Sequence, residues 1–245
     1  MQLGNSTALI TGAGRRIGAA CAQALAREGV AVVIHYGTSH AEALALQQTL
    51  LAEGGEAHLL SADLVDPEQT SLLLQQAQEV LGGRAVNILV NNAAIFLPGT
   101  LREGSLEHWN RHLAINLTAP FLLMQAFARR LPARNPGKII QLIDQYGDRP
   151  RPGYAAYSAA KSALWTLTRL AALELAPNIQ VNAIGPGPIL PAPGASAEGF
   201  ERIVAATPLQ RAGTLEDISA ALLFLLRHDF ITGEMICVDG GEHLR

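Results

Sequence analysis

The chain has 245 residues, of which 49% are hydrophobic and 16% charged, and its formal net charge at pH 7 is −3. This composition excludes an intrinsically disordered chain, and the weakly acidic balance argues against nucleic acid or an anionic membrane as a partner. Two distant cysteines, Cys21 and Cys237, do not make a disulfide scaffold or a zinc site, so no metal is expected. Because the sequence shows neither a signal-peptide pattern nor a membrane-length apolar run, we expect a cytoplasmic protein.

Apolar stretches typical of buried strands alternate with stretches of helical periodicity. We expect strands at 7–11, 30–35, 57–62, 86–90, 138–143, 179–184 and 235–238. Helices are expected at 16–28, 39–53, from 66 onward, at 105–131 and at 153–176. Strands separated by helices of about ten or more residues indicate a parallel sheet with helices on both faces. Strands that are apolar throughout agree with this, because parallel strands are buried on both sides.

One segment interrupts this alternation, the sequence GPGPILPAPG at 185–194, which a weakly helical stretch follows. So much proline and glycine after a strand indicates a loop, and its length favours a substrate lid at 186–206. A surface loop stiffened by proline is the alternative. Further along, Thr214 followed three residues later by Asp217 predicts a capped helix start.

The first expected strand runs directly into a glycine-rich turn, Thr11-Gly-Ala-Gly-Arg-Arg-Ile-Gly18. Glycines between a strand and a helix let the backbone approach a pyrophosphate, and the helix N-terminus adds N–H groups and a positive dipole. An ordinary strand–helix turn is the alternative interpretation. The position after the first strand favours a dinucleotide site.

The end of the second expected strand bears on which dinucleotide binds. An NAD site needs an acid there for the ribose 2′-hydroxyl, but no acid precedes Glu42 in this stretch. Donors occur instead at Arg15, His35, Thr38 and Ser39, and these favour the 2′-phosphate of NADP(H). Each of them could also be a surface residue or a helix cap, so the preference for NADP(H) rests on the four residues taken together.

Tyr157 and Lys161 lie four residues apart in an expected helix, so their side chains share one helix face. A nearby ammonium lowers the pKa of a tyrosine, which can then deliver a proton near neutral pH. Such a pair is common by chance. Asp144 adds weight because it follows the fifth expected strand, and the carboxyl ends of strands face the ligand crevice in an open parallel sheet.

An ordered set of motifs resembles the short-chain dehydrogenase/reductase family over nearly the whole chain. The motifs are Thr11-Gly12…Gly18, Asp63-Leu64, Asn91-Asn92-Ala93, Asn116, Tyr157-x-x-x-Lys161, Gly185-Pro-Gly187 and Val238-Asp-Gly-Gly241. The resemblance implies an α/β fold, with a single Rossmann-type doubly wound domain over residues 1–245 and a parallel seven-stranded sheet with helices on both faces. It also implies a homotetramer and catalysis by Asn116, Tyr157 and Lys161.

The same resemblance, with the donors described above, makes NADPH the expected cofactor. The residues expected to bind it are Gly12, Arg15, Arg16, Ile17, His35, Tyr36, Thr38, Ser39, Asp63, Leu64, Asn92, Ala93, Lys161, Gly187 and Ile189. Within this set, the resemblance implies that Asp63 and Leu64 contact the adenine and that Lys161 holds the nicotinamide ribose.

Two residues depart from the family pattern: Arg16 replaces a glycine of the phosphate loop, and Asp144 replaces the usual serine. A carboxylate there repels the negative charge that carbonyl reduction builds on oxygen. An imine instead takes hydride on carbon and a proton on nitrogen, and a carboxyl group beside a tyrosine can relay that proton. The pair resembles the pteridine reductase branch, which includes dihydromonapterin reductases. Phe96 matches its pterin-stacking aromatic, whereas Ala94 replaces a substrate-contacting serine of some members.

The resemblance therefore implies NADPH-dependent reduction of a 7,8-dihydropterin on its pyrazine ring. Dihydrobiopterin and dihydromonapterin are the expected substrates, and dihydrofolate is a candidate side substrate. The expected catalytic residues are Asp144, Tyr157, Lys161 and Asn116, and the expected substrate-binding residues are Arg16, Phe96, Asp144 and Tyr157. The alternatives are an NADPH-dependent carbonyl reductase of the 3-oxoacyl type and a non-catalytic NADP(H)-sensing protein. Arg245 is further expected to reach the site of a neighbouring subunit.

Overall fold

The computed structural model describes residues 2–133, 135–144, 152–192 and 194–245. Its centre is one seven-stranded parallel sheet with the order β3-β2-β1-β4-β5-β6-β7. The strands are β1 (Thr7–Ile10), β2 (Ala31–Tyr36), β3 (Ala57–Ser61), β4 (Ile88–Asn91), β5 (Gly137–Leu142), β6 (Ile179–Pro186) and β7 (Met235–Val238). Because β1 pairs with both β2 and β4, the strand order reverses there, as in a doubly wound sheet. The predicted fold class is confirmed.

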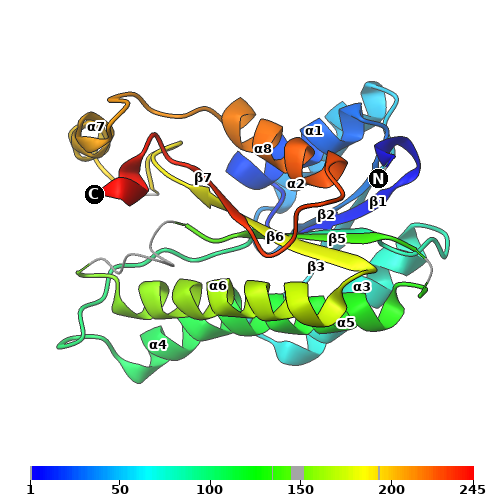
Figure 1. Ribbon diagram of the computed structural model, residues 1–245, viewed down its shortest axis with the longest axis horizontal. Coiled ribbons are helices and arrows are strands. Elements are labelled where there is room, and N and C mark those ends of the chain that lie inside the picture. Colours follow the sequence, from blue (N-terminus) through cyan, green and yellow to red (C-terminus); the bar gives the residue numbers. More distant parts are fainter. Residues whose placement is uncertain (1, 134, 145–151, 193) are drawn as a thin grey trace.

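Helices cover both faces of this sheet (Figure 1). One layer contains α1 (Arg16–Arg27), α2 (His40–Ala52) and α8 (Leu215–Arg227). The other contains α3 (Pro67–Val80), α4 (Leu106–Leu113), α5 (Ala119–Arg130) and α6 (Ala155–Leu175). The helix α7 (Ala197–Ala206) follows β6 and lies near the C-terminus, beyond one end of the sheet.

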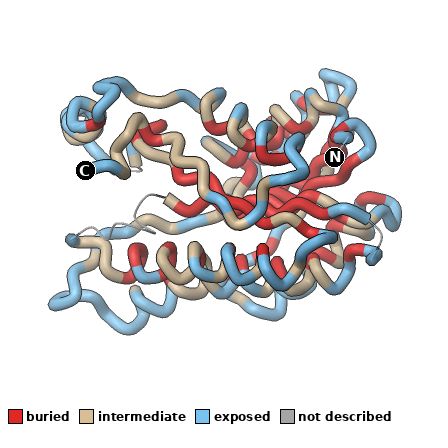
Figure 2. Tube along the Cα trace, in the orientation of Figure 1, coloured by how far each residue is buried: buried red, intermediate tan, exposed pale blue. Residues whose placement is uncertain are grey.

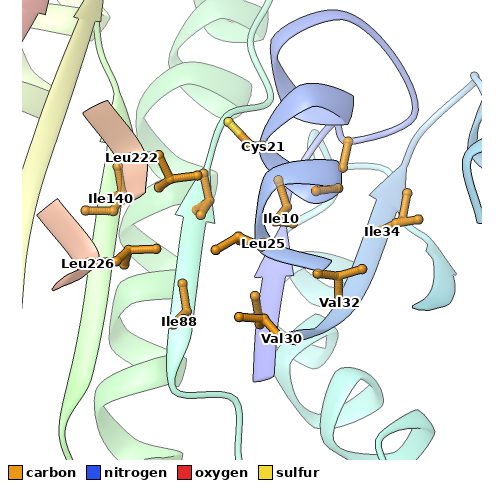
Figure 3. Close-up of a cluster of buried hydrophobic side chains, with 14 of the residues drawn as sticks. Ile10, Cys21, Leu25, Val30, Val32, Ile34, Ile88, Ile140, Leu222 and Leu226 are labelled. Atoms are coloured by element: carbon orange, nitrogen blue, oxygen red, sulfur yellow. The ribbon is translucent and has the colours of Figure 1, made fainter. Parts of the chain in front are cut away.

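Two apolar cores hold the helices to the sheet, one on each face. Successive strand residues point to opposite faces, so Ile88 and Val90 of β4 belong to one core and Leu89 to the other. Leu25 of α1 and Leu222 of α8 gather over the strands of the first core (Figure 3). Burying an aliphatic side chain contributes about 1.5–3 kcal/mol, so these layers fix the strand ends in place. Figure 2 shows the buried positions concentrated in the strands and on the helix faces toward them.

The long helix expected at 105–131 is interrupted by a π-helical turn, Ala114–Thr118, between α4 and α5. Pro120, in the first turn of α5, gives a local reason, because it has no N–H with which to bond the carbonyl of Asn116. Such π-turns occur often at functional sites. This one contains Asn116, which the sequence motifs single out.

The other expected elements differ from the observed ones mainly by one or two residues at their ends. The start of α8 is confirmed, because the Thr214 hydroxyl accepts from the Asp217 N–H and the Asp217 carboxylate accepts from the Thr214 N–H. Among the described residues, no helix has the length and apolarity that a membrane span requires.

Candidate active site

A cleft of about 2450 Å³ lies at the carboxyl ends of the strands, because its lining includes residues that follow β1, β3, β4 and β5. Its volume exceeds the roughly 300–1,000 Å³ typical of a small-molecule pocket, so it has room for a dinucleotide together with a second molecule. All the residues predicted to bind the cofactor line this cleft except Tyr36 and Ile189. All four residues predicted to bind substrate also line it.

The phosphate loop after β1 is tightly packed around two glycines. Gly12 has a φ of +62°, and a Cβ there would lie 3.0 Å from the Cα of Ala93. A Cβ on Gly18 would lie 2.5 Å from the amide nitrogen of Asn92. That nitrogen donates to the carbonyls of Thr11 and Gly12, at 2.8 and 3.0 Å. The loop backbone is therefore held close to the end of β4, at the N-terminus of α1, as a pyrophosphate site requires.

The structure corrects the predicted role of His35. Its ring is buried, Nδ1 accepts from the Gly12 N–H at 3.1 Å, and Nε2 donates to the Ala62 carbonyl at 3.1 Å. Burial lowers the pKa of His35 to about 4, so the ring is neutral and both nitrogens are already bonded. His35 therefore supports the phosphate loop and is not a spare donor for the 2′-phosphate.

The remaining predicted donors at that end of the cleft are Arg15, Thr38 and Ser39, which all line it. Tyr36 lies outside the lining residues, and its hydroxyl bonds to Nδ1 of His40 at 2.8 Å. Arginine and hydroxyl groups together suit a phosphate, so this end of the cleft keeps the chemistry expected for NADP(H).

Arg16 joins the phosphate loop to the segment predicted to be a lid. Its backbone has a φ of +57°, a left-handed conformation that glycine adopts most easily. This explains why the family pattern has a glycine at that position. The Arg16 guanidinium crosses the cleft and donates from Nη2 to the carbonyl of Pro191 at 2.8 Å.

Tyr157 and Asp144 meet inside the cleft. The Tyr157 hydroxyl donates to Oδ2 of Asp144 at 2.9 Å, although one residue comes from α6 and the other from the segment after β5. Asp144 has a φ of +110°, which is strained for a residue with a side chain. Strain of this kind is characteristic of functional positions.

Lys161 is fully buried beneath this pair. Its Nζ donates to the Leu142 carbonyl at 2.6 Å and lies 5.8 Å from the centre of the Tyr157 ring. Burial lowers the pKa of Lys161 to about 8, and the charge of Asp144 opposes that shift. The lysine therefore fixes α6 to the end of β5 and keeps a titratable cation beside the tyrosine.

Asn116, the fourth predicted catalytic residue, is buried and does not line the cleft. Its amide oxygen accepts from the Ile95 N–H, and its amide nitrogen donates to the Ile95 carbonyl, both at 2.9 Å. In this structure Asn116 therefore fastens the segment after β4. A direct catalytic role for it stays a prediction.

Phe96 follows in that segment and lines the cleft. Its ring stacks on Tyr154, with centroids 4.4 Å apart and an interplanar angle of 5°, and it meets Tyr157 edge-on at 4.8 Å. Tyr154 was not among the predicted site residues. Its place close to Tyr157 in the sequence marks it only as a candidate for the pocket lining, and the structure places it in the cleft, directly before the first residue of α6.

Sequence reasoning also missed cleft residues that come from distant parts of the chain. Those on α4 and near the C-terminus are Leu106, Glu107, Asn110, Arg111 and Glu242. The lining residues of α7, which are Gly199, Phe200, Arg202, Ile203 and Ala206, lie within the segment 186–206 that was predicted as a lid. Arg245, predicted to reach the site of a neighbouring subunit, lines the cleft of its own chain.

Replacing Lys161 by methionine tests the buried ammonium. Between the folded pKa of about 8 and the ordinary 10.5, the unfolded chain holds the extra proton, so the wild type gains stability as pH rises. Over that window, its free energy of unfolding should rise relative to Lys161→Met by on the order of 3 kcal/mol. Denaturant unfolding of both cofactor-free proteins measures this. A pH-independent difference contradicts it.

Comparison with known proteins shows the family to which the chain belongs. Residues 12–243 match the family described as Enoyl-(Acyl carrier protein) reductase. The crystal structure of FolM alternative dihydrofolate reductase 1 from Brucella canis, complexed with NADP, superimposes with a TM-score of 0.95. It is 37% identical, and the match covers 100% of this chain and 96% of that one.

Curated relatives point to the same family. An uncharacterized oxidoreductase of Mycobacterium tuberculosis is 39% identical over 98% of this chain and 93% of its own length. A 3-oxoacyl-[acyl-carrier-protein] reductase of Synechocystis is 34% identical, covering 96% of this chain and 95% of that protein. The chain therefore belongs to the short-chain dehydrogenase/reductase family and is an NADP-dependent oxidoreductase.

Proposed function

We propose that the protein is a pteridine reductase, which reduces a 7,8-dihydropterin such as dihydrobiopterin or dihydromonapterin to the tetrahydropterin. Dihydrofolate, which has the same ring system, is a further candidate substrate. The observation that carries the proposal is the 2.9 Å hydrogen bond between Tyr157 and Asp144. The similarity to a FolM alternative dihydrofolate reductase solved with NADP supports it.

The described residues fit NADPH. In the phosphate loop, the backbone of Gly12 lies against Ala93, where only glycine fits. The loop leads directly into the N-terminus of α1, whose N–H groups can bind a pyrophosphate. Arg15, Thr38 and Ser39 would hold the 2′-phosphate, and Lys161 would hold the nicotinamide ribose. When bound, NADPH supplies a hydride for a carbon of the pyrazine ring.

The chemistry of the Tyr157–Asp144 pair distinguishes an imine from a ketone. A carboxylate next to the reacting atom destabilises a developing oxyanion, which favourable sites instead stabilise with donors. When an imine is reduced, the carbon takes the hydride and the neighbouring ring nitrogen takes a proton. Tyr157 can deliver that proton. A proton from bulk water would then restore the Tyr157 hydroxyl, and Asp144 would relay it to the phenolate, directly or through a water molecule. Lys161, beside the phenol ring, would stabilise the phenolate that forms in between.

Two other cleft residues would hold the pterin itself. Phe96 offers an aromatic ring for a flat heterocycle, and Tyr154, stacked on it, supports its orientation. The Arg16 guanidinium has five N–H groups and uses one of them on Pro191, so it can also donate to a ring carbonyl oxygen. The same contact would draw the predicted lid, residues 186–206, over the bound substrate.

A carbonyl reductase of the 3-oxoacyl type is the second candidate. The Synechocystis relative carries that name, and the Tyr157 and Lys161 arrangement suits ketone reduction as well. Asp144 is the residue that argues against it. A sensor without catalysis has the least support, because it has no use for a tyrosine bonded to a carboxylate above a buried lysine.

Substitution of Asp144 tests the proposed reaction. Asp144→Asn keeps the volume and removes the acid, and Asp144→Ser restores the family residue. Both should lower kcat for 7,8-dihydrobiopterin by about 100-fold or more, the usual contribution of a general acid. Asp144→Ser should raise turnover of acetoacetyl-coenzyme A. Unchanged affinity for NADPH, measured by fluorescence, is the control. Faster pterin turnover in either variant contradicts the mechanism.

Substitution of Arg16 by glycine separates the backbone from the guanidinium. Glycine adopts the observed φ of +57° without strain, so the variant should fold with equal or greater stability. The KM for 7,8-dihydrobiopterin should rise about tenfold, because a hydrogen bond to a charged group contributes roughly 1.5–3 kcal/mol. Arg16→Lys, which keeps the charge without the planar fork, should recover the KM only in part. An unchanged KM in Arg16→Gly removes Arg16 from the substrate site.

We also propose that the chain forms a homotetramer. Large apolar side chains are exposed on α4, α5 and α6, including Trp109 at 38%, Phe121 at 42% and Leu173 at 79%. Exposed apolar patches of this kind mark association surfaces. Light scattering after size exclusion should give about four times the 26.0 kDa chain mass. A monomer mass at micromolar concentration contradicts this.

A further inference from the structure

The segment that carries Phe96, residues 95–99, has no regular secondary structure, yet its backbone is fastened at three alternate residues. Asn116 bonds both the N–H and the carbonyl of Ile95, at 2.9 Å. At the other end, the Gly99 N–H donates to the Gly153 carbonyl at 2.8 Å, and the Ala155 N–H donates to the Gly99 carbonyl at 3.1 Å. Between them, the Leu97 N–H donates to Nε2 of a histidine, His112.

His112 lies in the last turn of α4 and is completely buried. Its Nδ1 lies 3.0 Å from the carbonyl oxygen of His108, and a carbonyl only accepts, so Nδ1 carries the proton. Nε2 therefore has a lone pair, and it faces the Leu97 N–H at 3.4 Å. The neutral ring thus connects the backbone of α4 with the residue directly after Phe96.

A second histidine packs against the same segment. The centres of the His108 and His112 rings lie 4.4 Å apart. A Cβ on Gly99 would lie 2.6 Å from Nε2 of His108. The His112 ring also meets Tyr157 edge-on, with centroids 6.5 Å apart. One face of α4 therefore contacts the segment at Leu97 and at Gly99, and it also approaches Tyr157.

An apolar side chain at position 112 would fill the same space at less cost, because burying an imidazole requires partners for both nitrogens. It would leave the Leu97 N–H without its protein partner, although Leu97 is 44% exposed and water would compensate part of that loss. His112 has both partners, so its polarity serves the segment and not merely the packing of α4.

From this geometry we infer that His112 is a positioning residue for the substrate. By bonding the Leu97 N–H, it fixes the backbone next to Phe96 and so holds the Phe96 ring where a flat heterocycle can stack on it. This rests on the proposed function, in which Phe96 contacts the pterin. His112 does not line the cleft, so it would act through the backbone of residue 97.

The arrangement has a consequence for acidity. The groups that face His112 are His108 and Arg111 on α4 and Tyr157 on α6. Burial, above all, lowers the pKa of His112 below its ordinary 6.5, and the carbonyl of His108 opposes this. Protonation would turn Nε2 into a donor that faces the Leu97 N–H, which is also a donor. The segment therefore loses its middle anchor as pH falls through the lowered pKa of His112, and it keeps the anchor at higher pH.

Two substitutions separate the hydrogen bond from the packing. His112→Gln places an amide oxygen near the position of Nε2, whereas His112→Phe keeps a ring of similar size without an acceptor. His112→Phe should raise the KM for 7,8-dihydrobiopterin about tenfold, with kcat and the KM for NADPH within about threefold of wild type. His112→Gln should stay within about threefold throughout. Equal effects of both variants on both substrates mean a structural role only and overturn the proposal.

Two further readouts keep the inference testable if a variant folds poorly or the pterin reaction fails. In the wild type, the KM for the pterin should rise as pH falls below the ordinary histidine pKa of 6.5, and in His112→Gln this acid rise should be absent. Amide hydrogen exchange of residues 95–99 without substrate should be faster in His112→Phe than in wild type. If wild type turns over no pterin, the proposed function fails, and equal exchange rates in addition would show that His112 does not anchor the segment.

Discussion

The hydrogen bond between Tyr157 and Asp144 is the contact on which the rest of the site depends. The two residues come from α6 and from the segment after β5, and these are joined where the buried Lys161 donates to the carbonyl of Leu142 and where Leu164 packs on Ile143. Two features of this contact lower the stability of the fold. The ammonium of Lys161 is desolvated, and Asp144 adopts a strained φ of +110°. The layers of the doubly wound sheet supply the rigidity that keeps both features in place.

Two buried histidines give the surrounding loops their shape. His35 connects the phosphate loop to the segment after β3, and His112 connects α4 to the segment that carries Phe96. Each ring is neutral, accepts from a backbone N–H with one nitrogen and donates to a carbonyl with the other. Burial lowers the pKa of both, so neither ring carries charge into the cleft at neutral pH. The charged groups directly around the Tyr157 hydroxyl are therefore Asp144 and Lys161.

The sequence was sufficient for those features that periodicity and local chemistry determine. The parallel sheet, the bounds of β7 and the cap of α8 by Thr214 follow from strand spacing, apolar runs and a hydroxyl before an acidic turn. The approach of Asp144 to Tyr157 was also within reach, because strand ends and helix starts meet at one edge of such a sheet.

Other features depend on tertiary contacts that no local pattern contains. His35 was predicted as a phosphate donor because its residue type suits that role, but its burial decides otherwise. The positive φ of Arg16, the stacking of Tyr154 on Phe96 and the place of Arg245 in the cleft of its own chain depend on segments that meet only in the fold. The anchor at His112 joins α4 to a loop fifteen residues away, and only the fold shows the partner of its Nε2.

The central claim is that Asp144 commits this site to a C=N bond. The most direct measurement is NADPH oxidation by the purified wild-type protein, with 7,8-dihydrobiopterin or 7,8-dihydromonapterin in one assay and an acetoacetyl thioester in the other. The account predicts turnover of a dihydropterin and little or none of the thioester. Turnover of the thioester alone would contradict it and would show that a carbonyl reductase of this family tolerates an aspartate where a serine is usual.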